Sequence, residues 1–251
     1  MIRVDHEDGV AVVRLEHGKV NALDVELLRT AAATVRDLSS ADAIVITGRD
    51  SAFSAGVDLR RVLDGGPVYA AELVDAISDA ALALFDHPRP TVAAINGHAI
   101  AGGCVLAAAC DVRLMSGGSI GVTEVRVGVL FPTAPLEVVR HACGAAADEL
   151  VLSGRLLDAD AAQRCGLVHE VVAPDALLGT AVRRARDLSR VPASVYAATK
   201  QQLHRDTRRR ITENRDVDNA RVVAAWQDPQ TLVTMRSFLE RVTRAGTRAA
   251  S

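Results

Sequence analysis

The sequence predicts an α/β fold, and three observations support this prediction. Short runs of β-branched and apolar residues alternate with segments of helical periodicity over the first half of the chain. With 251 residues, of which 49% are hydrophobic, the chain is long enough to bury one large core. The stretch Thr91–Asp111 places a strand, an Asn96-Gly97 turn and a glycine-rich helix start in close succession. We take this stretch as the segment around which the fold is organised.

The first elements are a hairpin and a helix. Two strands are expected near Ile2–His6 and Val10–Glu16, and the Asp8-Gly9 dipeptide between them is a strong hairpin signal. Asp24 is expected to be the N-cap of a helix that extends to about Leu38.

Strands and helices then alternate. Ala43–Thr47 is typical of a buried strand, and a helix is expected at about Tyr69–Phe85. Thr91–Ile95 and Asp111–Met115 are the next strands, with a helix that begins at about Cys104 between them. This order is that of an α/β protein.

The second half of the chain is mostly helical from Ala134 onward, with one short strand expected at Gly166–Val172. The last sixty or so residues have only helical patterns. We therefore divide the chain into a core over residues 1–190 and a C-terminal helical region over residues 191–251.

Composition excludes several classes of protein. A net charge of −2 gives no electrostatic reason to bind nucleic acid. The longest apolar run, Ala99–Cys110, is too short to span a bilayer, and the opening residues lack a secretion signal, so we expect a cytoplasmic protein. The cysteines have no metal-binding spacing and are expected to be reduced core thiols; they are Cys104, Cys110, Cys143 and Cys165.

Gly102 and Gly103 lie at the expected start of an apolar helix. Their peptide N–H groups have no side chains to screen them and no partners within the helix, so they could hold a negative oxygen. Alternatively, the glycines only allow a buried helix to pack tightly against a strand. The pair by itself leaves both interpretations open.

A second segment of the same kind is Ala55-Gly56-Val57-Asp58-Leu59, which also follows a buried strand and also places a glycine ahead of a helix-like segment. Two such segments could each direct one backbone N–H group at the same point.

Four motifs then occur in order along the chain: Val20–Leu23, Phe53–Leu59, Asn96–Cys104 and Ala159–Val172. With these motifs, the sequence resembles the crotonase (enoyl-CoA hydratase/isomerase) superfamily over essentially its whole length. The resemblance implies a crotonase-like spiral of ββα units with a C-terminal helical trimerisation region. It also implies an acyl-CoA thioester as ligand in fatty-acid metabolism, no cofactor or metal beyond the coenzyme A of the substrate, and a homotrimer or homohexamer.

The resemblance also implies the site residues. The thioester carbonyl would be held between the backbone N–H groups of Val57 and Gly102. The residues expected to bind coenzyme A or substrate are Lys19, Ala22, Ala55, Gly56, Asp58, Leu59 and Gly103.

The acids decide the reaction within this superfamily. Hydratases use two glutamates, and here the first position is Val105, whereas Glu124 matches the second. Because valine cannot transfer a proton, the pattern is most similar to that of the monofunctional Δ3,Δ2-enoyl-CoA isomerases, in which one carboxylate shuttles a proton. His98 and Pro132 support this resemblance, since dienoyl-CoA isomerases have an aspartate where this chain has Pro132.

Two other functions stay open at this point. One is a hydratase or other lyase that takes a second acid from elsewhere, such as Asp58 or Glu72. The other is an acyl-CoA binder without catalytic activity.

Three further features have weaker interpretations. Ser54 lies in a segment that imitates a nucleophile elbow, but the intervening loop argues against this. His98 could be a base, although a turn or pocket-wall position is more usual. A basic run over Lys200–Arg210 could contact a coenzyme A phosphate or simply be a solvated helix face.

Overall fold

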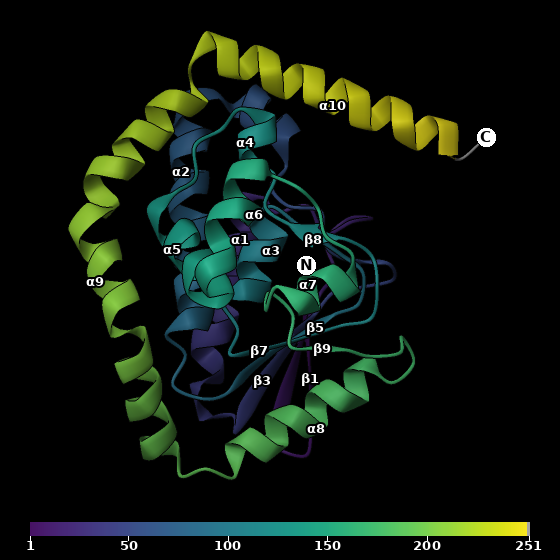
Figure 1. The fold of residues 1–251 in the computed structure, drawn as a ribbon, viewed down its shortest axis with the longest axis vertical. Coiled ribbons are helices and arrows are strands. Elements are labelled where there is room, and N and C mark those ends of the chain that lie inside the picture. The colour runs from purple at the N-terminus through teal and green to yellow at the C-terminus, as the bar shows by residue number, and fades with distance from the viewer. Residues whose placement is uncertain (250–251) are drawn as a thin grey trace.

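The computed structural model describes the backbone of residues 1–249 and the side chains of residues 1–241. It contains two sheets (Figure 1). The larger sheet has the strand order β1-β2-β3-β5-β7-β9, in which β1 and β2 are antiparallel and the other pairs are parallel. Its strands are β1 (Ile2–Glu7), β2 (Val10–Leu15), β3 (Ala43–Thr47), β5 (Thr91–Ile95), β7 (Val112–Met115) and β9 (Glu170–Val171).

The smaller sheet has three parallel strands in the order β4-β6-β8. They are β4 (Ala52–Ser54), β6 (His98–Ile100) and β8 (Ile120–Gly121). Each follows one strand of the larger sheet and precedes a helix, which gives three ββα units: β3-β4-α2 (Leu59–Phe85), β5-β6-α3 (Gly102–Ala108) and β7-β8-α4 (Glu124–Val127). Because β4, β6 and β8 are neighbours in one sheet, the loops that lead from these strands to their helices lie next to each other.

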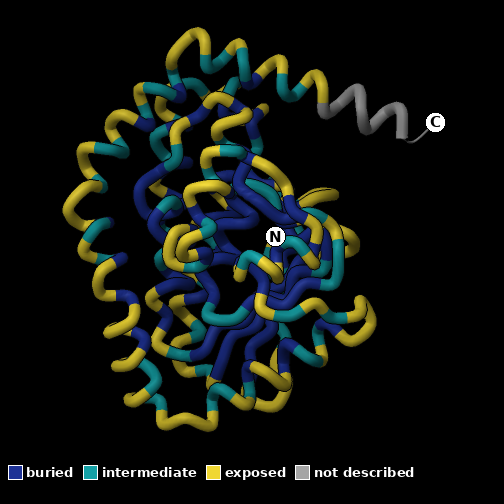
Figure 2. The backbone as a smooth tube through the Cα atoms, viewed as in Figure 1, coloured by how far each residue is buried: buried dark blue, intermediate teal, exposed yellow. Residues whose placement is uncertain are grey.

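Both faces of the larger sheet are buried. Helix α8 (Leu177–Ser189) covers one face, where Ala181 and Val182 pack with Val45 and Val92. The other face belongs to the main core, which includes α1 (Val25–Asp37), α2 and α3. Figure 2 shows the buried backbone concentrated in these central elements. Parallel strands covered on both faces are typically apolar throughout, which explains the continuous apolar runs in the sequence.

The remaining helices are α5 (Thr133–Cys143), α6 (Ala147–Ser153), α7 (Ala159–Arg164), α9 (Ala193–Trp226) and α10 (Pro229–Ala249). A short 3₁₀ turn follows α1 at Leu38–Ser40, and another follows α5 at Gly144–Ala146. Helix α9 runs along one side of the molecule against α5 and α2, and α10 continues from its end, on the far side from α8 (Figure 1). The residues that α9 buries change in character along the helix, from Lys200, His204 and Thr207 to Ile211, Val222 and Trp226.

The structure confirms the α/β class, the opening hairpin and the Asp24 N-cap, whose side chain accepts a hydrogen bond from the Leu27 amide. The expected helix at Tyr69–Phe85 forms the longer part of α2, and the helix-like segment expected after Asp58 forms its first part, which begins at Leu59 and is separated from the rest by a kink at the non-helical Gly66. The strand expected at Gly166–Val172 is only Glu170–Val171. The helix expected from Cys104 begins two residues earlier, at Gly102.

The division at residue 190 stays a prediction. Over the part of the chain that the structure describes, none of the helices combines the length and apolar character needed to cross a membrane.

Candidate active site

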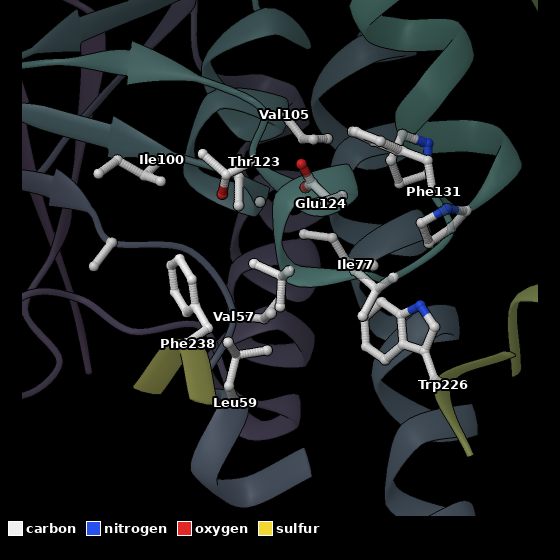
Figure 3. A pocket seen from close by; sticks show the side chains of 17 residues that line it. Val57, Leu59, Ile77, Ile100, Val105, Thr123, Glu124, Phe131, Trp226 and Phe238 are labelled. Atoms are coloured by element: carbon white, nitrogen blue, oxygen red, sulfur yellow. The ribbon is translucent and has the colours of Figure 1, made fainter. Parts of the chain in front are cut away.

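The three strands of the smaller sheet end at one edge, and a pocket lies there (Figure 3). Because the strands are parallel, the segments that follow β4, β6 and β8 leave the sheet side by side. These segments place Val57, Gly102 and Glu124 in the wall of one pocket. The other lining residues are Ala55, Leu59, Ile77, Ile100, Ala101, Val105, Thr123, Val127, Val129, Phe131, Pro132, Pro135, Trp226 and Phe238.

Asn21 fixes the segment after β4. This residue has a left-handed backbone, with φ of 50°, and its Nδ2 donates to the carbonyl oxygens of Ala52 and Phe53 at 3.2 and 3.1 Å. Ser54 Oγ donates in turn to the Asn21 carbonyl at 2.7 Å and accepts from the Gly56 amide at 3.1 Å. The fully buried Ser54 hydroxyl therefore links two backbone segments. Because a nucleophile would have to be accessible to substrate, the nucleophile-elbow interpretation is wrong.

The Val57 amide is left without a protein acceptor. Its neighbours are paired: the Leu23 amide donates to the Gly56 carbonyl at 2.8 Å, and the Asp58 amide donates to the Leu23 carbonyl at 2.9 Å. Among the hydrogen bonds of the described residues, none uses the Val57 N–H group.

The Gly102 amide also has no acceptor among the hydrogen bonds of the described residues. Gly102 is the first residue of α3, so its N–H group has no acceptor within the helix. Ala101 before it has φ of 52° and ψ of −121°, a strained conformation for alanine that sets the direction of the next amide. A Cβ atom at Gly102 would lie 3.5 Å from Val57 Cγ1, so the two free amides belong to one small region of the pocket.

Gly103 has a different role from Gly102. A Cβ atom at Gly103 would lie 2.6 Å from the carbonyl oxygen of Ser54, closer than packed atoms approach, so glycine is needed for α3 to pack against β4. The packing interpretation therefore applies to Gly103, whereas the binding of a negative oxygen by the Gly102 amide stays a prediction.

Glu124 is the first residue of α4, and its carboxylate points into the apolar part of the pocket (Figure 3). The residue is half-buried, but its Oε2 atom is closed off from solvent and has no hydrogen-bond partner. Burial raises the pKa of Glu124 from 4.5 to about 7, although backbone hydrogen bonds lower it in part. Of the valines near it in the sequence, Val122 and Val127 are buried, whereas Val125 is 43% exposed.

Glu124 is the one ionisable side chain among the described residues that line the pocket. Val105, at the position of the other acid, is 1% exposed and lines the pocket with methyl groups. The two acids considered as substitutes lie elsewhere: Asp58 caps α2 through the Arg60 and Arg61 amides, and Glu72 pairs with Arg29 at 3.0 Å.

His98 is exposed on β6, outside the pocket, and its Nδ1 accepts a hydrogen bond from the Ser119 amide at 3.2 Å. The suggestion that His98 acts as a base is therefore wrong for this pocket. In residues 1–241, no group of three or more His, Cys, Asp or Glu side chains is placed to hold a metal ion.

The expected coenzyme A and substrate residues separate into two sets. Ala55 and Leu59 line the pocket. The others do not: Gly56, Asp58 and Gly103 shape the backbone beside it, and Lys19 and Ala22 lie outside it. Contact of these residues with coenzyme A stays a prediction.

The basic run of α9 is largely occupied by ion pairs. Lys200 is buried and bonds Asp111 at 2.8 Å. Arg208 pairs with Asp86 at 3.2 Å, and Arg210 pairs with Glu137 at 2.5 Å. These side chains hold α9 against the core, and a contact with coenzyme A would have to compete with those pairs.

The sequence did not identify Phe131, Trp226 and Phe238 individually as residues of the pocket wall. Trp226 and Phe238 come from α9 and α10, more than a hundred residues after Gly102. The one signal in the sequence was that Trp226 is the single tryptophan of a chain poor in aromatic residues, which marked it as a residue to locate in the structure.

The raised pKa of Glu124 predicts a dependence of stability on pH. Between pH 4.5 and 7 the folded chain binds more protons at this site than the unfolded chain, so its free energy of unfolding falls as pH rises through this range. Glu124→Gln removes this dependence. From pH 4.5 to pH 8, the free energy of unfolding of the wild type should therefore fall by up to about 3 kcal/mol more than that of the variant. Urea unfolding of both proteins at the two pH values measures the effect, and an equal pH dependence in the two would contradict it.

Comparisons with known proteins agree with this architecture. Residues 5–245 match the model of the family described as enoyl-CoA hydratase/isomerase. Human mitochondrial enoyl-CoA delta isomerase 1 is 27% identical over 250 residues, which cover 96% of this chain and 83% of that protein. A probable enoyl-CoA hydratase of Mycobacterium bovis is 31% identical over 250 residues, which cover 96% of this chain and 95% of that protein.

Among solved structures, that of human mitochondrial Δ3,Δ2-enoyl-CoA isomerase superposes with a TM-score of 0.92 at 26% identity, covering 97% of this chain and 98% of that one. The superposition therefore extends over both sheets and the C-terminal helices. The chain belongs to the enoyl-CoA hydratase/isomerase family, the crotonase superfamily, and has its spiral of ββα units.

Proposed function

We propose that the chain is a Δ3,Δ2-enoyl-CoA isomerase, which moves the double bond of a 3-enoyl-CoA to position 2. The observation that carries this proposal is the single ionisable side chain, Glu124, among the described residues of an otherwise apolar pocket. The similarity to the human isomerase in sequence and fold supports it.

The reaction begins with removal of a proton from C2. Glu124 accepts this proton as the C2–H bond breaks, and the electron pair is delocalised onto the thioester oxygen as an enolate. The proton on Glu124 is then delivered to C4, the electron pair returns from the oxygen, and the double bond comes to lie between C2 and C3. No atom is gained or lost, so one carboxylate suffices.

The free amides of Val57 and Gly102 suit the charge that develops on the thioester oxygen. Two fixed donors in a largely apolar pocket stabilise such a charge by several kcal/mol, because they need no reorientation when it forms. A pKa of about 7 suits Glu124 for its task, since it accepts and releases a proton near neutral pH.

The alternative reaction is hydration of a 2-enoyl-CoA, and several relatives are named as probable hydratases. Hydration in this family would use a second acid to help activate water. Val105 cannot supply one, and neither Asp58 nor Glu72 lines the pocket. The geometry therefore favours isomerisation. A binder without catalytic activity would not need a carboxylate desolvated in this way.

The ratio of the two activities tests the proposal. The purified protein should equilibrate 3- and 2-enoyl-CoA, and it should hydrate 2-enoyl-CoA about two powers of ten more slowly, because it lacks one proton-transfer group. Val105→Glu should raise hydration relative to isomerisation, at a stability cost of several kcal/mol for the buried carboxylate. Val105→Gln is the matched control, since it has the same length and no acid. Efficient hydration by the wild type would contradict the proposal.

We also propose that the reaction needs no cofactor other than the coenzyme A of the substrate, and that the chain forms a trimer or a hexamer. Val195, Leu203 and Val233 support an assembly, because these apolar side chains on α9 and α10 are 54%, 69% and 54% exposed. The cytoplasmic location stays a prediction from the sequence.

A further inference from the structure

The pocket has an open end and a closed end. Ala55 is exposed and Ile100 is half-buried, and both lie near the free amides of Val57 and Gly102. The opposite part of the wall is buried: Val127 and Val129 are 5% exposed and Trp226 is 3% exposed. A thioester placed at the two amides therefore directs its acyl chain past Glu124 toward Trp226.

Trp226 is held in a fixed orientation. It is the last residue of α9, and its indole Nε1 donates to the carbonyl oxygen of Leu130 at 2.9 Å. Leu130 lies between Val129 and Phe131, which both line the pocket. This hydrogen bond therefore joins the indole to the adjoining wall of the pocket, so an acyl chain cannot displace the buried ring without breaking the bond of its N–H group.

The surrounding wall is also stiff. Phe131 is followed by Pro132, and Pro135 lies one helical turn further on, all in the pocket lining. The chain has one Trp, two Tyr and four Phe residues, and the Trp and two of the Phe line this pocket. Aromatic and proline side chains have few rotamers, so this wall adapts less to a longer chain than a wall of leucine or methionine.

We propose that Trp226 closes the acyl end of the pocket and sets the maximum length of a straight acyl chain. This inference rests on the proposed function for the position of the thioester. Trp226 is then a specificity-determining residue: it makes no contact with C2, C3 or C4 and takes no part in proton transfer.

The single tryptophan makes the inference testable without turnover. Saturated acyl-CoA esters of increasing length are titrated into the wild type, and the emission of Trp226 is recorded. The spectrum should be unchanged by short chains and should shift once the chain is long enough to reach the indole. Affinity measured by calorimetry should rise about fourfold for each added methylene, the factor for about 0.8 kcal/mol, and should then stop rising at that same length.

Two variants locate the limit. Trp226→Ala should move it to longer chains, with a further fourfold gain for each newly accommodated methylene. Trp226→Phe should keep the limit within one or two methylenes, because a ring still closes the pocket, as expected on steric grounds. Leu152→Ala, at a position of α6 that is 76% exposed and outside this pocket, is the control and should leave the limit unchanged.

Circular dichroism and thermal unfolding establish that each variant is folded, and Trp226→Leu replaces the alanine variant if that protein is unstable. An unchanged length limit in a folded Trp226→Ala or Trp226→Leu protein would overturn the inference. So would emission that responds equally to all lengths. Because these readouts are binding, a protein that binds esters with a length limit but does not isomerise them would contradict the proposed reaction and leave this inference standing.

Discussion

Glu124→Gln should lower isomerase turnover by about two to four powers of ten, the usual effect of losing a general base. Glutamine keeps the length and shape of the side chain but cannot accept a proton from C2. Affinity for a saturated acyl-CoA should stay within a few-fold, because the amides of Val57 and Gly102 and the apolar wall are unchanged. Steady-state kinetics with a 3-enoyl-CoA and calorimetry with the saturated ester measure the two quantities.

The pH profile provides an internal control for this variant. In the wild type, kcat/KM should fall as pH decreases below about 7, because the carboxylate of Glu124 becomes protonated. The residual activity of Glu124→Gln should not follow this titration. Turnover that survives the change would remove Glu124 from the mechanism. No turnover in either protein, with ester binding intact, would favour a binder without catalytic activity.

The second large effect should come from the backbone. Gly102→Pro removes the free N–H group and should lower turnover by about two to three powers of ten, the range found for losing one donor to a developing oxyanion. At the first position of a helix the amide has no partner within the helix, so this change breaks none of the hydrogen bonds of α3. Circular dichroism establishes that the variant is folded.

Gly102→Ala is the matched control because it adds a Cβ atom and keeps the N–H group. That Cβ atom would lie 2.9 Å from Leu23 Cδ1, the flexible end of a side chain that can move aside. The alanine variant should therefore keep most of the turnover. Equal losses in the two variants would mean that space at residue 102, and not its amide, limits the reaction.

Much of the fold could be predicted because local signals and tertiary structure agree. The Asp8-Gly9 hairpin, the Asp24 N-cap and the buried strand at Ala43–Thr47 each combine a turn or capping residue with an apolar run. Gly66 and Pro67 correctly indicated a break, because Gly66 is non-helical and α2 kinks there. The sequence did not show that the segments on both sides form nearly continuous helix, since this depends on the burial of their apolar side chains in the core.

The site could be predicted where it depends on short motifs. Val57, Gly102 and Glu124 follow three strands of one parallel sheet, and the structure brings them to one pocket. Their roles in the reaction stay predictions. Trp226 and Phe238 could not be identified individually, because no local pattern shows which residues of the C-terminal helices reach this pocket. The ion pair of Lys200 could not be predicted for the same reason, because its partner Asp111 lies 89 residues earlier in the chain.

The most direct test of the single-base mechanism follows the proton itself. A 3-enoyl-CoA with deuterium at both C2 positions is converted in ordinary water, and the 2-enoyl-CoA product is examined by NMR and mass spectrometry. Because Glu124 Oε2 is closed off from solvent, part of the deuterium removed from C2 should be delivered to C4 before it exchanges. Product with deuterium at C4 is the predicted result. Product with only hydrogen from water at C4, at every stage of the reaction, would contradict a shuttle by Glu124 alone.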